Sequence, residues 1–409
     1  MITKEFIHDI PKSDLHVHLD GSLRLPTLIE IAQREKIELP SYTEEGLNET
    51  VFKAHYASLE EYLAGFAYTV QALQNPENLE RVAYEFARDN QDEGVRYVEV
   101  RFAPQLHIND RMDLETVLVS VNRGLERAAK EYNSRLEVAD GSEPRFHYGI
   151  ITCALRSFGK MSGYYRSFFR AHPYSKLKWV FGLASYELFQ GVVEVRDRLG
   201  LPLVGCDLAG AEYGYPADDH WKAFQFAQKK FLHKTVHAGE AYGAESIFQA
   251  ITDLYAERLG HGYYLFDEDK ITSPEIVDKA RYIRHLSGHI ADKRITIEVC
   301  LTSNLQTNPS IGKLSNHRFT RMREAGLSTT FCTDNRLVSK TTVSRENSLA
   351  VEAFGITPKE LKNHTIYGFK RCFFPGNYTE KRSYVRSVID YYEEIERQHN
   401  LAEKGDDPS

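Results

Sequence analysis

Eight short apolar runs, separated by helical stretches, constrain the fold of this 409-residue chain more than any other feature. The runs are rich in β-branched residues, and we predict strands at 13–19, 95–101, 146–154, 202–208, 233–238, 257–261, 294–300 and 328–333. In the segments between these predicted strands, apolar residues recur about every 3.6 residues, which predicts helices at 79–92, 114–132, 186–199, 221–230 and 245–256. Because strands that alternate with helices form parallel sheets, and eight such repeats can close, we expect a TIM (β/α)8 barrel.

One long segment, residues 22–92, separates the first two predicted strands and does not fit the simple alternation. It is mostly helical, and an apolar stripe runs along it at Leu59, Tyr62, Leu63 and Phe66. Barrel enzymes build lids from long insertions that follow a strand, so we expect a helical insertion that covers the site. A plain core helix is an equally good interpretation of the stripe.

The composition is that of an ordinary globular protein. Hydrophobic residues make up 42% of the chain, charged residues 27%, and the net charge is -7. An acidic chain without clustered Lys and Arg argues against nucleic acid or an anionic membrane as a partner. No stretch approaches the ~20 apolar residues of a membrane span, and residues 1–11 lack the apolar segment of a signal peptide. We expect one domain over residues 1–409, with a disordered tail at 402–409.

The cysteines indicate the compartment. None belongs to a C-x-x-C pair, and most lie inside predicted strands; they are Cys153, Cys206, Cys300, Cys332 and Cys372. This pattern favours buried thiols in a reducing compartment over a disulfide framework. A cytoplasmic location is therefore expected.

A pair of histidines, His16 and His18, ends the first predicted strand. Residues two apart on a strand point to the same face, so both rings can reach one ion inside the barrel. The H-x-H spacing alone is equally compatible with core packing. Its position adds weight, because Asp20 and Gly21 follow where a loop should begin.

Later strands end in residues that complete a metal site. His237 ends the fifth predicted strand, and Asp334 follows the eighth. Because a barrel gathers the C-terminal ends of its strands around one axis, both should meet His16 and His18. Three imidazoles and one carboxylate suit Zn²⁺, which lowers the pKa of a water in its open position toward ~7. We therefore predict one zinc ion per chain.

Two further residues can move protons beside this ion. Glu240 lies three residues after His237, and His261 ends the sixth predicted strand between two glycines. We expect Glu240 to act as an acid toward the substrate, which requires burial to raise its pKa. We expect His261 to orient the water and to take part in moving its proton; the alternative is a core histidine. Ligands, acid and base in one pocket point to metal-assisted hydrolysis.

Taken in order, these motifs resemble those of the adenosine deaminase family. The matching segments are S-D-L-H-V-H-L-D-G-S at 13–22, V-G-C-D-L-A-G at 204–210, H-A-G-E at 237–240, R-L-G-H-G at 258–262, C-L-T-S-N at 300–304 and T-D-N at 333–335. The resemblance implies a zinc-dependent TIM barrel that removes the 6-amino group of a purine nucleoside by hydrolysis.

The resemblance also implies a role for each catalytic position. The zinc ligands that it implies are His16, His18, His237 and Asp334. Glu240 would protonate the purine ring nitrogen next to the attacked carbon. His261 and Asp334 would steer the attacking water.

The substrate contacts follow from the same resemblance. Asp20 would hold the ribose 5′-hydroxyl, Gly210 would present its backbone to the purine, and His18 would also lie against the substrate. The apolar lid would be formed by Leu59, Tyr62, Leu63 and Phe66.

Asn335 departs from the family pattern, because many members have an aspartate there. The family's residue is expected to contact the purine N7, which is an acceptor. An aspartic acid must be protonated to donate to N7, whereas an asparagine amide donates at any pH. Asn335 is therefore expected to preserve binding.

The expected reaction converts adenosine and 2′-deoxyadenosine to inosine and 2′-deoxyinosine, with release of ammonia. The alternatives are deamination of adenine, an N6-substituted AMP or an aminodeoxyfutalosine-type nucleoside; Asp20 disfavours a 5′-phosphate by charge repulsion. A further alternative is a catalytically idle relative that binds nucleosides. Another is a two-metal amidohydrolase, although the run 203–208 contains neither Lys nor Glu to bridge two ions. The oligomeric state and the metal loaded in the cell stay open.

Two other patterns are interpreted as structural. His285 and His289 share a helical face, but the glutamate of H-E-x-x-H is missing, which favours a solvated face. The segment 164–179 carries Arg166 and Arg170 among aromatic residues. It could contact a phosphate, but in an acidic chain we interpret it as a packed, solvated helix.

Overall fold

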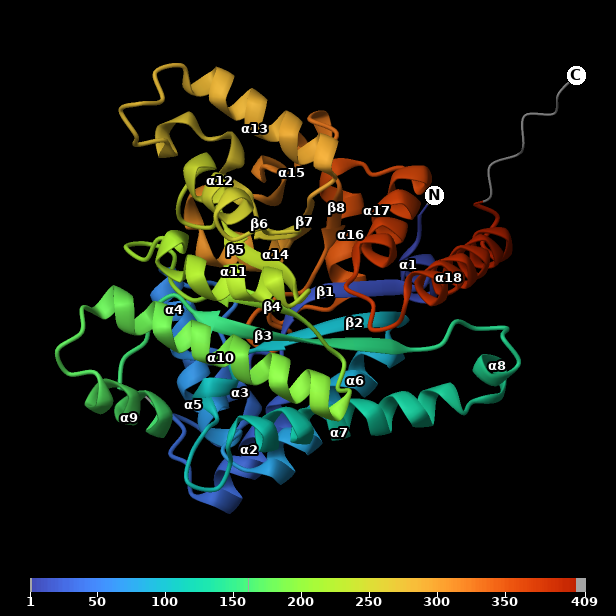
Figure 1. Ribbon diagram of the computed structural model, residues 1–409. Coiled ribbons are helices and arrows are strands. Elements are labelled where there is room, and N and C mark those ends of the chain that lie inside the picture. Colours follow the sequence, from blue (N-terminus) through green and yellow to red (C-terminus); the bar gives the residue numbers. More distant parts are fainter. Residues whose placement is uncertain (1, 161, 402–409) are drawn as a thin grey trace, which may run out of the picture.

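The computed structural model describes residues 2–160 and 162–401, and its core is an eight-stranded barrel (Figure 1). The strands are β1 (Lys12–His18), β2 (Val95–Phe102), β3 (His147–Leu155), β4 (Leu203–Ala209), β5 (His233–Ala238), β6 (Arg258–His261), β7 (Thr296–Val299) and β8 (Thr329–Phe331). They lie in chain order, and every neighbouring pair is parallel. A parallel bridge between Val17 and Asp334 brings the end of the chain's last strand back to the first. The predicted TIM barrel is confirmed.

Each predicted strand is present close to its expected position. β2 and β4 are buried along their whole length, as expected for strands covered on both faces. β7 and β8 are shorter than predicted. Three residues after β8, Asp334 adopts a left-handed conformation with φ of 62°. The predicted tail at 402–409 lies outside the described residues.

Helices cover the outside of the barrel (Figure 1). The larger ones are α6 (Pro76–Asp92), α7 (Leu114–Asn133), α10 (Leu177–Leu199), α11 (Trp221–Lys229), α12 (Ala244–Thr252), α13 (Lys279–Lys293) and α16 (Val343–Phe354). Shorter helices between strands are α8 (Leu136–Ala139), α9 (Gly163–Ala171), α14 (Leu301–Thr307) and α15 (Phe319–Glu324). The predicted helices are all present, and α10 begins earlier than expected because Val180, Phe181 and Ala184 pack into an aromatic cluster with α9.

The insertion after β1 consists of α2 (Leu25–Glu35), α3 (Glu44–Thr50), α4 (Leu59–Ala64) and α5 (Phe66–Ala72), followed by α6. Because α6 packs against α7 and β2, it belongs to the outer ring, and the inserted helices are α2 to α5. The hydroxyl of Ser58 caps α4 by accepting the Glu61 N–H. Gly65 separates α4 from α5, so the predicted apolar stripe is divided between two short helices.

The remaining helices lie toward the N-terminal ends of the strands. They are α1 (Lys4–Asp9), α17 (Pro358–Arg371) and α18 (Tyr378–Gln398). α17 packs against β1 and β8, and α1 contacts α18. Among the described residues, no helix combines the length and apolar character that a membrane crossing requires. All five cysteines are buried and free.

Candidate active site

A cavity of about 1280 Å³ opens where the barrel strands end. Its polar floor contains His18, His237, Glu240, His261 and Asp334. Its walls contain the other predicted substrate contacts, which are Asp20, Leu59, Tyr62, Leu63, Phe66, Gly210 and Asn335. His16 is fully buried beside this floor. The structure therefore gathers every residue that the sequence analysis placed in the site.

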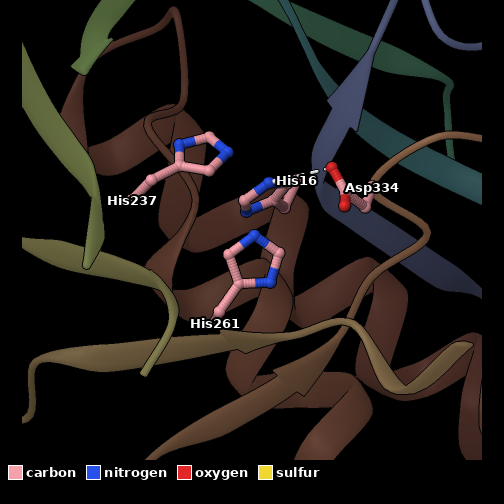
Figure 2. Close-up of side chains that lie close together, drawn as sticks. All are labelled: His16, His237, His261 and Asp334. Atoms are coloured by element: carbon pink, nitrogen blue, oxygen red, sulfur yellow. Dashed lines mark ion pairs between the residues drawn. The ribbon is translucent and has the colours of Figure 1, made fainter. Parts of the chain in front are cut away.

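The side chains of His16, His237, His261 and Asp334 point toward one another (Figure 2). One ligand atom from each of His16, His237, His261 and Asp334 lies within 4.8 Å of the others. His18 is outside this group, although its Nε2 lies 3.3 Å from Nε2 of His237 and 3.5 Å from Oδ1 of Asp334. The mutual distances therefore favour His261 over the predicted His18 as the third imidazole.

Buried carboxylates orient two of these histidines. Nδ1–H of His16 donates to Glu298 at 2.8 Å, and Nδ1–H of His237 donates to Asp207 at 2.9 Å. Each ring therefore keeps the lone pair of Nε2 for another partner, which is the usual arrangement around a ligated metal. Nε2 of His16 is buried and finds no hydrogen-bond partner within the described chain. This donor set fits a metal ion.

The carboxylates are themselves held by buried arginines. Arg101 pairs with Asp207 and Glu298, both at 2.9 Å, and Arg258 pairs with Glu298 at 2.7 Å and with Glu99. Although burial alone would raise it, the pKa of Glu298 is held well below its usual range by these two arginines and by His16. Charged carboxylates below the histidines fix both the direction and the tautomer of the rings.

Backbone geometry brings the rings close together. A side chain at Gly260 would come within 2.8 Å of Cε1 of His16, so only glycine leaves room for that ring. His261 and Asp334 both adopt positive φ, at 65° and 62°. Such conformations are costly for residues with a side chain and persist where packing enforces them, often at functional sites.

The protonation states of three of the four rings suit metal binding. For His16, burial would lower the pKa, but Asp334 and Glu298 raise it. Burial, which opposes a charge, holds the pKa of His18 and of His261 well below the usual value and lowers that of His237, so these rings are neutral at pH 7. Burial would raise the pKa of Asp334, but His16, His261 and His18 together lower it. Neutral imidazole and ionised carboxylate are the forms that bind metal.

Glu240 reaches the same floor from the loop after β5. Its carboxylate lies 3.8 Å from Nε2 of His261. Burial, and then the charges of Asp334 and Glu212, raise its pKa to about 8, so it carries a proton at neutral pH.

The loop that carries Glu240 is held by Glu212, which is 1% exposed. The Glu212 carboxylate accepts the N–H groups of residues 239 to 242 at 2.6–3.0 Å, and the hydroxyl of Ser246 donates to it as well. Successive N–H groups that converge on one carboxylate set the path of this loop.

Two polar residues stand out on the cavity wall. Asp20 is buried, its Oδ1 has no hydrogen-bond partner among the described residues, and burial raises its pKa to about 7. The amide of Asn335 donates to the hydroxyl of Tyr62 at 2.7 Å, and that hydroxyl also pairs with Ser339 at 2.8 Å. Asn335 therefore ties α4 to the end of the barrel.

A comparison with known families identifies this arrangement. The sequence model described as "Adenosine deaminase" matches residues 11–156 and 177–391, which is most of the chain.

The chain belongs to the adenosine deaminase family. Adenosine deaminase from Mycolicibacterium vanbaalenii is 35% identical over 391 residues, which cover 95% of this chain and 96% of that protein. Adenosine deaminase from Mycobacterium leprae is 36% identical over 393 residues, or 94% and 96% of the two chains. Membership of this family makes the protein an enzyme, a hydrolase of the deaminase type.

Solved structures share the fold at lower identity. An amidohydrolase from Burkhoderia ambifaria with bound Zn superposes with a TM-score of 0.76 at 19% identity, over 98% of this chain and 96% of that one. An N6-methyl-AMP deaminase from Arabidopsis thaliana superposes with a TM-score of 0.71 at 23% identity, over 95% and 98%. Both share the barrel fold of this chain.

The family match stops between residues 156 and 177, where α9 lies. Tyr164 and Tyr165 on α9 pack within the aromatic cluster, as predicted for this basic segment. The same helix also lines the cavity with Arg166 and Arg170, both exposed, which the sequence interpretation did not place there. Elsewhere, His285 and His289 are exposed on α13, in line with the predicted solvated face.

Several residues that contact the predicted site residues, directly or through one another, were not singled out from the sequence. They are Arg101, Asp207, Glu212, Arg258, Glu298, Ser303, Asn304 and His317. A charged residue inside an otherwise apolar strand, such as Arg101 or Glu298, is the signal that would have revealed part of this set. Glu212 and His317 lie in loops, where nothing in the local sequence separates them from surface residues.

Proposed function

We propose that the protein catalyses the zinc-dependent hydrolysis of adenosine and 2′-deoxyadenosine to inosine and 2′-deoxyinosine, with release of ammonia. One observation carries the proposal: the carboxyl group of Glu240 lies 3.8 Å from Nε2 of His261, on a floor where three histidines and Asp334 converge. This is the set of groups that hydrolysis at an amidine carbon requires. The family's relatives named adenosine deaminase support the substrate.

The residues that would hold the metal are His16, His18, His237 and Asp334. When bound, Zn²⁺ supplies Lewis-acid chemistry that lowers the pKa of water and prepares it for attack. Asp207 and Glu298 would keep the two rings that they contact in the ligating tautomer.

Glu240 would act as the acid. Its pKa near 8 leaves it protonated at pH 7, and its loop is held in place by Glu212. Donation of this proton to the purine ring nitrogen beside the attacked carbon would draw electrons from that carbon and favour addition of water. His261 and Asp334 would steer the water.

The cavity walls suit a neutral purine nucleoside. Leu59, Leu63 and Phe66 supply an apolar wall for the base. Asp20, which has a free acceptor oxygen, would hold the ribose 5′-hydroxyl. Gly210 lines the cavity, where its backbone would contact the purine.

Asn335 would contact the purine N7 with the second hydrogen of its amide, because the first is donated to Tyr62. The same side chain would then join the substrate to α4. This supports the helices α4 and α5 as the lid that covers the base.

A 5′-phosphorylated substrate, such as an N6-substituted AMP, is the second candidate. Arg166 and Arg170, which line the cavity from α9, favour it. Asp20 disfavours it by charge repulsion when ionised. We rank it below adenosine because Asp20 is the buried group and the arginines are exposed.

The test is a panel of 6-aminopurines followed by ultraviolet absorbance, with and without a chelator. The panel contains adenosine, 2′-deoxyadenosine, adenine, AMP and N6-methyl-AMP. The proposal expects the highest kcat/KM for the two nucleosides and loss of activity with the chelator. Fastest turnover of adenine or of a phosphorylated compound would contradict it. Protein that binds zinc but releases no ammonia from any compound would indicate an idle relative.

The protein's partner is then a small nucleoside. Five buried free thiols agree with a reducing cytoplasm, which we propose as its location.

A further inference from the structure

A chain of buried hydrogen bonds ends at His261. The backbone N–H of Phe319, the first residue of α15, donates to Nδ1 of His317 at 3.0 Å. Nε2 of His317 lies 3.1 Å from Oδ1 of Asn304, and Nδ2 of Asn304 lies 3.1 Å from Nδ1 of His261. The three side chains belong to residues that are 2%, 3% and 1% exposed. We call this chain the amide relay.

The direction of the amide relay follows from its first member. A backbone N–H only donates, so Nδ1 of His317 must present a lone pair to Phe319. Burial lowers the pKa of His317 to about 3, so the ring is neutral and its single proton is on Nε2. That proton needs an acceptor, and the nearby group is the carbonyl oxygen of Asn304.

The orientation of Asn304 then decides the state of His261. With its oxygen toward His317, the amide must turn its NH₂ group toward Nδ1 of His261. An N–H donor facing Nδ1 requires a lone pair there, and the proton of the neutral His261 ring is left on Nε2. Nε2 is the atom that faces Glu240 and the cavity.

We propose that the amide relay holds His261 as an Nε2–H donor toward the cavity, so that this ring donates a hydrogen bond to the attacking water. This inference rests on the proposed function. Asn304 and His317 are positioning residues, since they act through His261.

The amide relay also separates the two possible ligand sets. Nδ1 of His261 accepts a hydrogen bond from the amide of Asn304, and Nε2 carries a proton, so neither nitrogen has a free lone pair to bind a metal. His18, whose Nε2 faces His237 and Asp334, is then the third imidazole. The mutual distances alone would favour His261.

The decisive experiment is ¹⁵N NMR of the zinc-loaded protein labelled at histidine, in which multiple-bond ¹H–¹⁵N correlations show which ring nitrogen carries the proton. The signals of His261 are assigned by comparison with the His261→Phe variant. We expect an unprotonated Nδ1 and a protonated Nε2 for His261. A protonated Nδ1, or a bare Nε2, would overturn the proposal. No activity is needed for this measurement, so it stands apart from a failure of the proposed function.

A variant tests the consequence for catalysis. In Asn304→Asp the carboxylate only accepts, so Nδ1 of His261 must donate and the tautomer should reverse. We expect kcat to fall on the order of 10²-fold while KM changes less than about threefold, because a wrong tautomer affects the reaction more than binding. A reversed tautomer with unchanged kcat would refute the donor role of His261.

Asn308→Asp is the matched control. Asn308 follows α14 one turn after Asn304, and its amide donates to the hydroxyl of Tyr264. The same amide-to-carboxylate change there leaves the amide relay intact. We expect kcat within about twofold of the parent and an unchanged NMR signature for His261. If Asn304→Asp does not fold, the spectrum of the parent protein still decides the tautomer.

Discussion

The floor and the mouth of the cavity are built differently. The floor consists of histidines and carboxylates at the strand ends, and paired buried charges such as Arg101 with Glu298 hold them from below. The mouth consists of short helices, α4, α5 and α9, which present partly exposed side chains. Much of the floor lies in motifs of the family, whereas α9 falls in the gap of the family match. We therefore propose that the floor determines the reaction and that the mouth determines which substrates bind.

The largest effect should come from the acid on the floor. In Glu240→Gln we expect kcat to fall about 10²- to 10⁴-fold, the usual contribution of general acid catalysis. The parent should lose kcat as the pH rises through about 8, because the acid works only while protonated, and the variant should lack this alkaline fall.

Glu245→Gln is the control for Glu240→Gln. Glu245 is on the adjacent helix α12, and its carboxylate accepts the N–H groups of Thr272 and Ser273 away from the floor. Its activity should stay within about twofold of the parent. Equal losses in both variants would show that Glu240 acts through stability and not as the acid.

Loss of a carboxylate below the ligands should weaken metal binding. In Asp207→Asn the charge that faces His237 and Arg101 is removed. We expect zinc affinity to fall about 10- to 100-fold, as is usual for such neighbours of a ligand. Competition with a chromophoric chelator measures this, and Asp197→Asn on the surface of α10 is the control. An unchanged zinc affinity would show that the charge of Asp207 does not support metal binding by His237.

Asn335 connects floor and mouth, and its replacement should create a new pH dependence. In Asn335→Asp the carboxylic acid must be protonated to donate to N7, whereas the amide donates at any pH. The ratio of variant to parent kcat/KM should therefore fall as the pH rises from 5 to 9. Parallel profiles for variant and parent would argue against the N7 contact.

Apolar residues of the mouth should affect binding more than chemistry. In Leu63→Ala we expect KM for adenosine to rise about three- to tenfold, while kcat stays within about twofold, because apolar contact with the base contributes equally to substrate and transition state. Leu136→Ala, at an exposed site on α8, is the control. A fall in kcat instead would indicate that α4 contributes to the chemical step.

The smallest effect is expected at the rim. In the double variant Arg166→Gln with Arg170→Gln, kcat/KM for adenosine should stay within about twofold, because exposed charges contribute little to a neutral ligand. Steady-state kinetics with adenosine and with N6-methyl-AMP measure the change. A large loss of kcat/KM for adenosine would indicate that α9 contacts the nucleoside directly.

Much of the site could be predicted because its parts are local in sequence. His16 and His18 end a recognisable strand, and HAGE at 237–240 ends another, so barrel topology was enough to bring them together. The division of the apolar stripe between α4 and α5 was not predicted, because Gly65 leaves the helical period unchanged while it ends one helix and begins the next.

The sequence by itself determined the barrel, the types of side chain that could bind a metal, and the family. The alternation of strands with helices and the order of the motifs can be read directly along the chain. Only the tertiary structure decided the rest. Burial raises the pKa of Glu240, Glu212 sets the path of its loop, and the amide relay from Phe319 chooses between His18 and His261. Each of these depends on hydrogen bonds or burial between segments far apart in the chain, and no local pattern encodes such contacts.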